Sequence, residues 1–147
     1  MTTAADRFFV DTNILVYATD PQSPWHANAT QALNDARQEG IELVISPQVV
    51  REYLAIATRP VGGKSRTTDA LENVKIFQAE LEVVETDLAV TAQLLVLIEK
   101  YAVAGKQVHD ANLVSTMLVH GIQHILPHNV SDFARFSDLV TVLPLVS

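Results

Sequence analysis

The sequence has no cysteine among its 147 residues, so no disulfide bond contributes to its stability. A chain of this length buries roughly 70% of the surface that it exposes when unfolded, which suffices for a core without disulfides or a structural metal. We therefore expect one domain over residues 1–147. The N-terminal segment MTTAADRF lacks the basic flank and the long apolar stretch of a signal peptide, so we expect a cytoplasmic protein.

Long apolar segments and a surplus of basic residues are also missing. Charged residues or proline interrupt the apolar runs well before the ~20 residues that a membrane-spanning helix requires, so we expect no membrane partner. The 17 Asp and Glu residues outnumber the 10 Lys and Arg residues, and the net charge is −7. This balance excludes a simple electrostatic clamp on nucleic acid. If the chain handles nucleic acid, bound cations must offset some of its carboxylates.

The apolar residues that are present alternate between strand-like and helix-like spacing. Buried strands are predicted at 7–10, 41–46, 82–86, 122–128 and 139–145. Helices are predicted at 13–20, 24–39, 47–59, 68–81, 87–105 and 109–121. Two serine–proline pairs, Ser23-Pro24 and Ser46-Pro47, mark helix starts. Because parallel neighbouring strands need crossover connections, the alternation predicts an α/β fold with helices on both faces of a parallel sheet.

Acidic residues stand where predicted strands end or helices begin. Asp11 interrupts the apolar segment RFFVDTNILVYATD directly after the first strand. In an open parallel sheet, ligands bind beyond the carboxyl ends of the strands, so Asp11 is placed at that edge. Glu52 lies in the first turns of the helix after the second strand, Asp110 opens a later helix, and Asp132 follows the fourth strand. We expect these four carboxylates to converge, although each taken alone is also compatible with a helix cap or a solvated acid.

Clustered carboxylates need a positive charge beside them, because like charges at close range raise one another's pKa values. Mg²⁺ and Mn²⁺ prefer oxygen ligands and keep several waters when only a few carboxylates hold them. Such an ion polarises a phosphate oxygen and lowers the pKa of a bound water. The pattern therefore favours phosphoryl chemistry that needs no serine or cysteine nucleophile.

Four segments of the sequence together resemble the PIN-domain ribonucleases, especially the VapC-type toxins of prokaryotic toxin–antitoxin pairs. They are FFVDTNILVYA, VVREYLAIATRP, GKQVHDANLVSTMLVHGI and HNVSDFARF. The first motif alone occurs in unrelated strands, but four segments in the family's order and spacing are far more specific. The resemblance implies a PIN-like three-layer α/β/α domain with a four- to five-stranded parallel sheet.

The resemblance also implies an activity, partners and site residues. The expected activity is that of an Mg²⁺-dependent endoribonuclease, with Mn²⁺ as an alternative ion, that cleaves RNA by a metal-activated water. The expected partners are an RNA substrate, a cognate antitoxin and a second copy of the chain in a homodimer. The expected catalytic residues are Asp11, Glu52, Asp110 and Asp132, with Asp11, Asp110 and Asp132 as metal ligands.

Several polar and basic residues are expected to assist these acids. The supporting residues are Asn13, Asn129 and His109. The candidate phosphate contacts are Arg59, Lys64, Lys106 and Arg135. The basic residues are chosen because they lie near the acidic segments, and each is equally compatible with an ordinary solvated charge.

The segment before the fourth acid departs from the family pattern. Relatives carry Thr-x-Asp or Thr-x-Asn there, whereas this chain has Pro127-His128-Asn129 before Asp132-Phe133. Proline lacks both a hydroxyl and an N–H that could orient a neighbouring acid. A catalytically weak PIN-like binding protein is therefore one alternative. An aspartate-based phosphatase or receiver domain is another, although Asn13 breaks the Asp-x-Asp pair that such phosphatases need.

Overall fold

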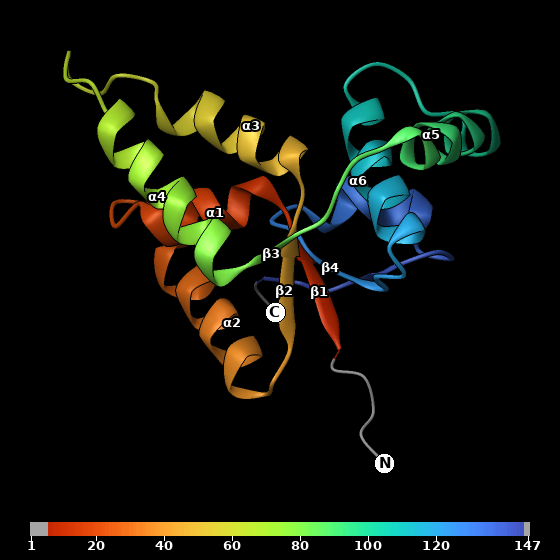
Figure 1. The fold of residues 1–147 in the computed structure, drawn as a ribbon, viewed down its shortest axis with the longest axis horizontal. Helices are drawn as coiled ribbons and strands as arrows, with labels where there is room; N and C mark the ends of the chain where they lie inside the picture. The colour runs from red at the N-terminus through yellow and green to blue at the C-terminus, as the bar shows by residue number, and fades with distance from the viewer. Residues whose placement is uncertain (1–5, 146–147) are drawn as a thin grey trace.

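A computed structural model describes residues 6–145, and its five strands form one parallel sheet in the order β3-β2-β1-β4-β5 (Figure 1). The strands are β1 (Arg7–Val10), β2 (Glu42–Ile45), β3 (Glu82–Val83), β4 (His124–Leu126) and β5 (Thr141–Val142). At the centre of the sheet, Phe9 of β1 pairs with Val44 of β2 on one side and with Ile125 of β4 on the other. The predicted α/β fold with a parallel sheet of four to five strands is therefore confirmed.

Helices cover both faces of the sheet, which confirms the predicted three-layer α/β/α arrangement (Figure 1). On one face lie α1 (Thr12–Thr19), α2 (His26–Gln38), α3 (Pro47–Ala57) and α4 (Thr67–Glu80), and on the other lie α5 (Leu88–Tyr101) and α6 (Gln107–Val119). The 3-10 helix η1 (Val130–Phe136) packs beside α6. Within residues 6–145, no helix combines the length and the apolar character needed to cross a membrane.

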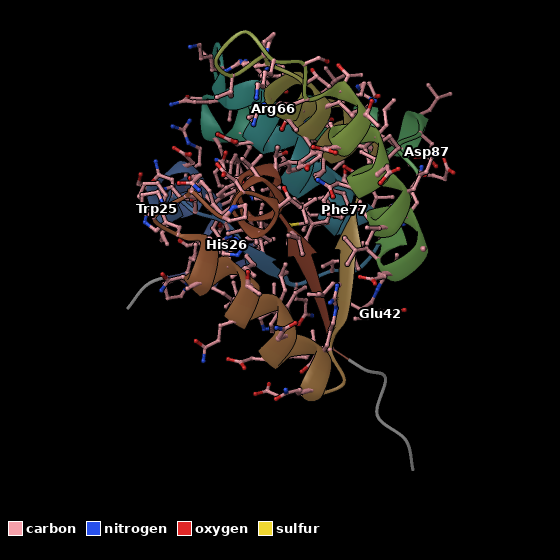
Figure 2. All side chains as sticks on the ribbon, turned by 90° about the vertical axis from the view of Figure 1, so that its left-hand side faces the viewer. Trp25, His26, Glu42, Arg66, Phe77 and Asp87 are labelled. Carbon is pink, nitrogen blue, oxygen red and sulfur yellow. The ribbon has the colours of Figure 1, made fainter. Side chains whose placement is uncertain are left out.

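The core lies between the sheet and its two helical layers. Phe9, Val44, Ile45 and Ile125 are fully buried, because helices cover the sheet from both sides. This double covering explains why the strands are almost continuously apolar rather than alternating in polarity. On the α4 side, Phe77, labelled in Figure 2, packs its ring edge-on against Tyr53 of α3, with the ring centroids 4.9 Å apart.

The two serine–proline pairs behave differently. Ser46 is the N-cap of α3 and Pro47 is its first residue, as predicted. Helix α2 begins at His26 instead of residue 24, so the prediction at Ser23-Pro24 is wrong by two residues. Residues 23–25 form a turn instead, in which the N–H of His26 donates to the carbonyl of Ser23 at 3.1 Å. The ring of Trp25 (Figure 2) packs against that of His128 in the segment after β4, with the ring centroids 4.5 Å apart.

The edge strands are shorter than the sequence predicts. β3 covers two residues instead of 82–86, and β5 covers two residues instead of 139–145. Each pairs with only one neighbour over two positions. Beyond them, a single backbone hydrogen bond continues each contact, from the N–H of Val84 to Ile45 and from the N–H of Leu143 to Ile125, both at 2.9 Å. Residues 1–5 and 146–147 lie outside the described range. Residues 1–5 belong to the N-terminal segment MTTAADRF, on which the expectation of a cytoplasmic protein rests.

Candidate active site

A pocket of about 280 Å³ lies at the carboxyl edge of the sheet, and all four predicted acids line it. Its lining residues are Asp11, Thr12, Asn13, Glu52, Ala55, Ile56, Asp110 and Asp132. They come from the β1–α1 junction, α3, α6 and η1. The structure thus brings together side chains that lie up to 121 positions apart in the sequence.

Asp11 is fixed by both the sheet and a helix. Its backbone N–H donates to the carbonyl of Leu126 at 3.2 Å, which continues the pairing of β1 with β4. Its side chain is the N-cap of α1, where Oδ1 accepts a hydrogen bond from the N–H of Thr12 at 2.7 Å. Only 9% of the residue is exposed. Asp11 is therefore a buried carboxylate whose backbone position is set by strand pairing.

Glu52 is held by two donors that the sequence prediction missed. Its Oε2 accepts from the hydroxyl of Thr12 at 3.0 Å, and its Oε1 accepts from the side-chain amide of Gln48 at 2.9 Å. Gln48 lies four residues before Glu52 on α3, a spacing that places both side chains on the same helix face. In the sequence, this four-residue spacing is the one signal that could have identified Gln48 as a partner of Glu52. For Thr12, the signal is its position directly after Asp11.

Asp110 and Asp132 complete the acidic lining from the other side of the pocket. Asp110 stands in the first turn of α6 and is half-buried. Asp132 is exposed and stands in the first turn of η1. Asn129 caps η1 by accepting from the N–H of Ser131 at 3.3 Å, and its amide donates to Oδ1 of Asp132 at 3.3 Å. Asn129 thus contacts the fourth acid directly.

Burial and mutual repulsion raise the pKa values of two of these acids. Burial is the main cause that raises the pKa of Asp11 from 3.8 to about 7, and the charges of the other three acids add to the rise. The hydrogen bond from the N–H of Thr12 acts in the opposite direction and lowers this pKa. Burial is also the main cause that raises the pKa of Asp110 to about 6, and the charges of Asp132 and Glu52 add to it. His109 and Arg135 act in the opposite direction on Asp110. The pocket therefore favours an incoming positive charge.

The donor chemistry of the pocket fits a hard divalent cation, because carboxylate oxygens are the ligands that Mg²⁺ and Mn²⁺ prefer. As the side chains lie, no three or more His, Asp or Glu residues of the described chain are grouped so that they could hold a metal ion. Glu52 directs its oxygens to Thr12 and Gln48, and Asp11 directs one oxygen to the backbone of α1. Holding one ion would require the carboxylates to turn toward a common point.

The other predicted residues lie in or around the pocket. Asn13 lines it. His109 is exposed at the start of α6, and its carbonyl accepts from the Gln48 amide at 3.1 Å. The four candidate phosphate contacts are absent from the lining: Arg59 and Lys64 lie in the exposed loop after α3, Lys106 is the N-cap of α6, and Arg135 lies in the last turn of η1.

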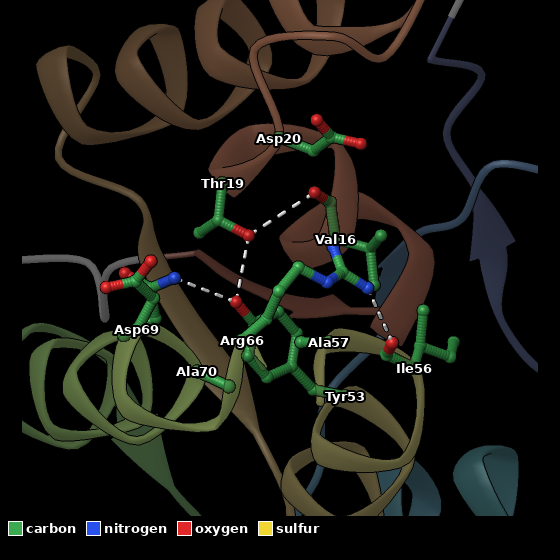
Figure 3. Close-up of a pocket in the computed structure, with 10 residues that line it drawn as sticks. Val16, Thr19, Asp20, Tyr53, Ile56, Ala57, Arg66, Asp69 and Ala70 are labelled. Atoms are coloured by element: carbon green, nitrogen blue, oxygen red, sulfur yellow. Dashed lines mark hydrogen bonds between the residues drawn. The ribbon is translucent and has the colours of Figure 1, made fainter. Parts of the chain in front are cut away.

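A second cavity of about 120 Å³ lies between α1, α3 and α4, and Ile56 lines both cavities (Figure 3). In it, the hydroxyl of Tyr53 lies 2.9 Å from that of Thr19 and accepts from the amide of Asn73 at 3.0 Å. Arg66 donates to the carbonyl of Ile56 at 3.2 Å. These bonds fasten α3, the helix that carries Glu52, to both of its neighbouring helices.

Comparisons with known proteins agree with this fold. A sequence profile of the PIN domain matches residues 8–139. The fold is similar to VapBC2 from Rickettsia felis bound to a promoter DNA fragment (TM-score 0.68, 16% identity, covering 94% of this chain and 98% of that chain). It is also similar to a toxin–antitoxin complex from Klebsiella pneumoniae (TM-score 0.69, 17% identity, covering 95% of this chain and 98% of that chain).

A third similar structure is VapC20 from Mycobacterium tuberculosis, a Sarcin-Ricin loop cleaving toxin (TM-score 0.69, 15% identity, covering 89% of this chain and 94% of that chain). At identities this low, the likeness is one of fold. No curated protein matches the sequence. The resemblance read from the four sequence segments is confirmed by the profile match and by these structures.

Proposed function

This chain belongs to the PIN-domain family, and on that basis we propose that it is a metal-dependent endoribonuclease and the toxin of a toxin–antitoxin pair. The observation that carries the proposal is the single pocket lined by Asp11, Glu52, Asp110 and Asp132. The raised pKa values of Asp11 and Asp110 support it, because burial and neighbouring carboxylates disfavour their charged forms and a bound divalent cation would stabilise those forms.

In this proposal, Asp11, Asp110 and Asp132 would hold the cation. A bound ion would polarise a phosphate oxygen of the RNA and lower the pKa of the attacking water. Glu52 orients that water through the oxygen lone pairs that Thr12 and Gln48 leave free. The products are a 5′-phosphate and a 3′-hydroxyl.

The basic residues around the pocket have a separate role in substrate binding. Lys106 and Arg135 lie on the elements that carry Asp110 and Asp132, so they can contact phosphates on either side of the cleaved bond. Arg59 and Lys64 extend this contact from the exposed loop after α3. Single-stranded or loop RNA is the proposed substrate class, because its bases are accessible and its backbone can bend into a pocket.

The proposed partners follow from the similar structures and the charge of the pocket. Two of those structures are toxin–antitoxin complexes, which supports an antitoxin as the protein partner. An arginine or lysine presented by the antitoxin would pair with the carboxylates and block access to them. A homodimer is the proposed assembly of the toxin itself.

The test is an RNA cleavage assay with the purified chain and 5′-labelled, loop-containing RNA. Cleavage is expected with Mg²⁺ or Mn²⁺ and not in excess chelator. Asp11→Asn and Asp110→Asn should each abolish cleavage while the circular dichroism spectrum is retained. Asp35→Asn, an exposed acid on α2, is the matched control and should cleave like the wild type.

Three outcomes would contradict the proposal. Equal cleavage in excess chelator would exclude metal dependence. RNA binding without cleavage would favour the alternative of a PIN-like binding protein. Formation of an acyl phosphate at Asp11 would favour the aspartate-based phosphatase or receiver alternative, against which the PIN-domain match already argues.

A further inference from the structure

We propose that Gln48 is a positioning residue for the acidic pocket, whose side-chain amide holds the Glu52 carboxylate at a fixed place relative to the first turn of α6. The inference rests on the proposed function, since it deepens the role of Glu52 in that pocket. Gln48 is 5% exposed and lies on α3 immediately after its N-terminal proline. It does not line the pocket itself.

The orientation of the Gln48 amide is fixed by the chemistry of its three partners. Nε2 lies 2.9 Å from Oε1 of Glu52 and 3.1 Å from the carbonyl oxygen of His109. Both partners can only accept, so the NH₂ group must face them, and each of its hydrogens has one acceptor. The remaining atom, Oε1 of Gln48, accepts from the side-chain amide of Asn112 at 2.5 Å. If the amide were flipped, its oxygen would face the Glu52 carboxylate and the His109 carbonyl, and neither of them could donate a hydrogen bond to it.

The three partners belong to two different helices, which gives the amide its positioning effect. Glu52 is on α3, whereas His109 and Asn112 are on α6, one residue before and two residues after Asp110. One planar amide therefore connects the carboxylate of Glu52 to the backbone that carries Asp110. The separation of these two acids is set by a buried hydrogen-bonded group instead of by flexible side chains alone.

The second donor to Glu52 shows what the loss of Gln48 would do. Thr12 holds Oε2, so without Gln48 the carboxylate keeps one anchor and can rotate about it. Removal of an outer partner of this kind commonly lowers activity 10–100-fold. Because Gln48 is buried behind Glu52, its loss should affect the reacting arrangement and leave the binding of RNA nearly unchanged.

The first test is Gln48→Met, which keeps the length of the side chain and removes the donors and the acceptor. We expect kcat for RNA cleavage to fall by about 10–100-fold while KM stays within about threefold of the wild type. The matched control is Tyr53→Phe, since Tyr53 is also buried on α3 and also bonds to neighbouring helices, but through the second cavity. Tyr53→Phe should keep kcat within about threefold. Equal losses of kcat in both variants would overturn the inference.

A second measurement uses the folded, metal-free protein and does not depend on cleavage. In the NMR spectrum of the wild type, both side-chain amide protons of Gln48 should exchange with water more slowly than those of Gln78, which is exposed on α4. Glu52→Leu removes one acceptor and leaves the His109 carbonyl. One Gln48 amide proton should then shift and exchange faster, and the other should stay protected.

The two readouts separate the positioning role from the proposed function. If neither Gln48 amide proton responds to Glu52→Leu, the inference is overturned whatever the protein cleaves. If the wild type cleaves no RNA but one proton responds as expected, the proposed function fails and the bond between Gln48 and Glu52 stands. If Gln48→Met does not fold, the measurement on Glu52→Leu decides the question.

Discussion

Asp11→Asn should make the cation-free protein more stable at alkaline pH, although it removes a proposed catalytic acid. Asp11 titrates with a pKa of about 7 in the folded chain against an ordinary 3.8, with burial as the main cause. A carboxyl whose pKa is raised on folding binds its proton more tightly in the folded state, so stability falls as pH rises from about 4 to about 7. Above that range the full loss, about 4 kcal/mol, is present.

The part of this loss that falls between pH 5 and pH 8 can be measured. With the same two pKa values, ionisation of Asp11 lowers the free energy of unfolding by about 3 kcal/mol across that interval. Asparagine has the same shape and can still accept the hydrogen bond from the N–H of Thr12, but it carries no charge. The free energy of unfolding of the variant should therefore rise by about 3 kcal/mol relative to that of the wild type between pH 5 and pH 8.

The assay is urea denaturation in excess chelator at pH 5, 6, 7 and 8, with the free energy of unfolding compared at each pH. Titrating groups outside the pocket contribute almost equally to the wild type and the variant, so they cancel in the difference. Asp35→Asn should follow the wild type at every pH, because that acid is exposed on α2. The reasoning would be refuted if the free energies of unfolding of Asp11→Asn and the wild type differed by the same amount, within about 0.5 kcal/mol, at all four pH values.

Three further predictions concern the ion, the substrate and the fold. Mg²⁺ at 100 times its Kd should stabilise the wild type by about 2.7 kcal/mol in thermal or urea unfolding, and an equal gain in Asp110→Asn would contradict the assignment of that ligand. Lys106→Gln should reduce the slope of log K against log salt for RNA binding by about 0.7, measured by fluorescence anisotropy, and an unchanged slope would remove Lys106 from the interface. Tyr53→Phe should lower the free energy of unfolding by about 1 kcal/mol because it loses bonds to Thr19 and Asn73, and unchanged stability would show that those bonds contribute nothing.

The central strands and the convergence of the acids could be predicted because both depend on rules that act along the sequence. Strands covered on both faces are continuous apolar runs, which is why RFFV and ELVI are recognisable. Acids directly after such runs lie at the carboxyl edge of the sheet, where the pocket containing Asp11 and Asp132 is found.

Features that depend on packing between distant segments could not be predicted from the sequence. Trp25, the residue before α2, packs against His128, over a hundred positions away. Each short edge strand pairs with two residues of a longer neighbour, and the sequence does not specify where that pairing begins and ends. The bonds of Gln48 depend on the rotamers of groups on two helices, and a sequence pattern does not specify rotamers.

The order of the strands explains how the acids meet without any local sequence motif that joins them. β1 is the central strand, with β2 and β4 as its neighbours, so the segments that follow these three strands leave the sheet side by side. Asp11 follows β1, Glu52 is on the helix after β2, and Asp132 is on the segment after β4. The same placement buries Asp11 beside three like charges, which works against the stability of the fold. A neutral residue at position 11 would stabilise the cation-free chain above about pH 7, so the needs of folding do not account for Asp11.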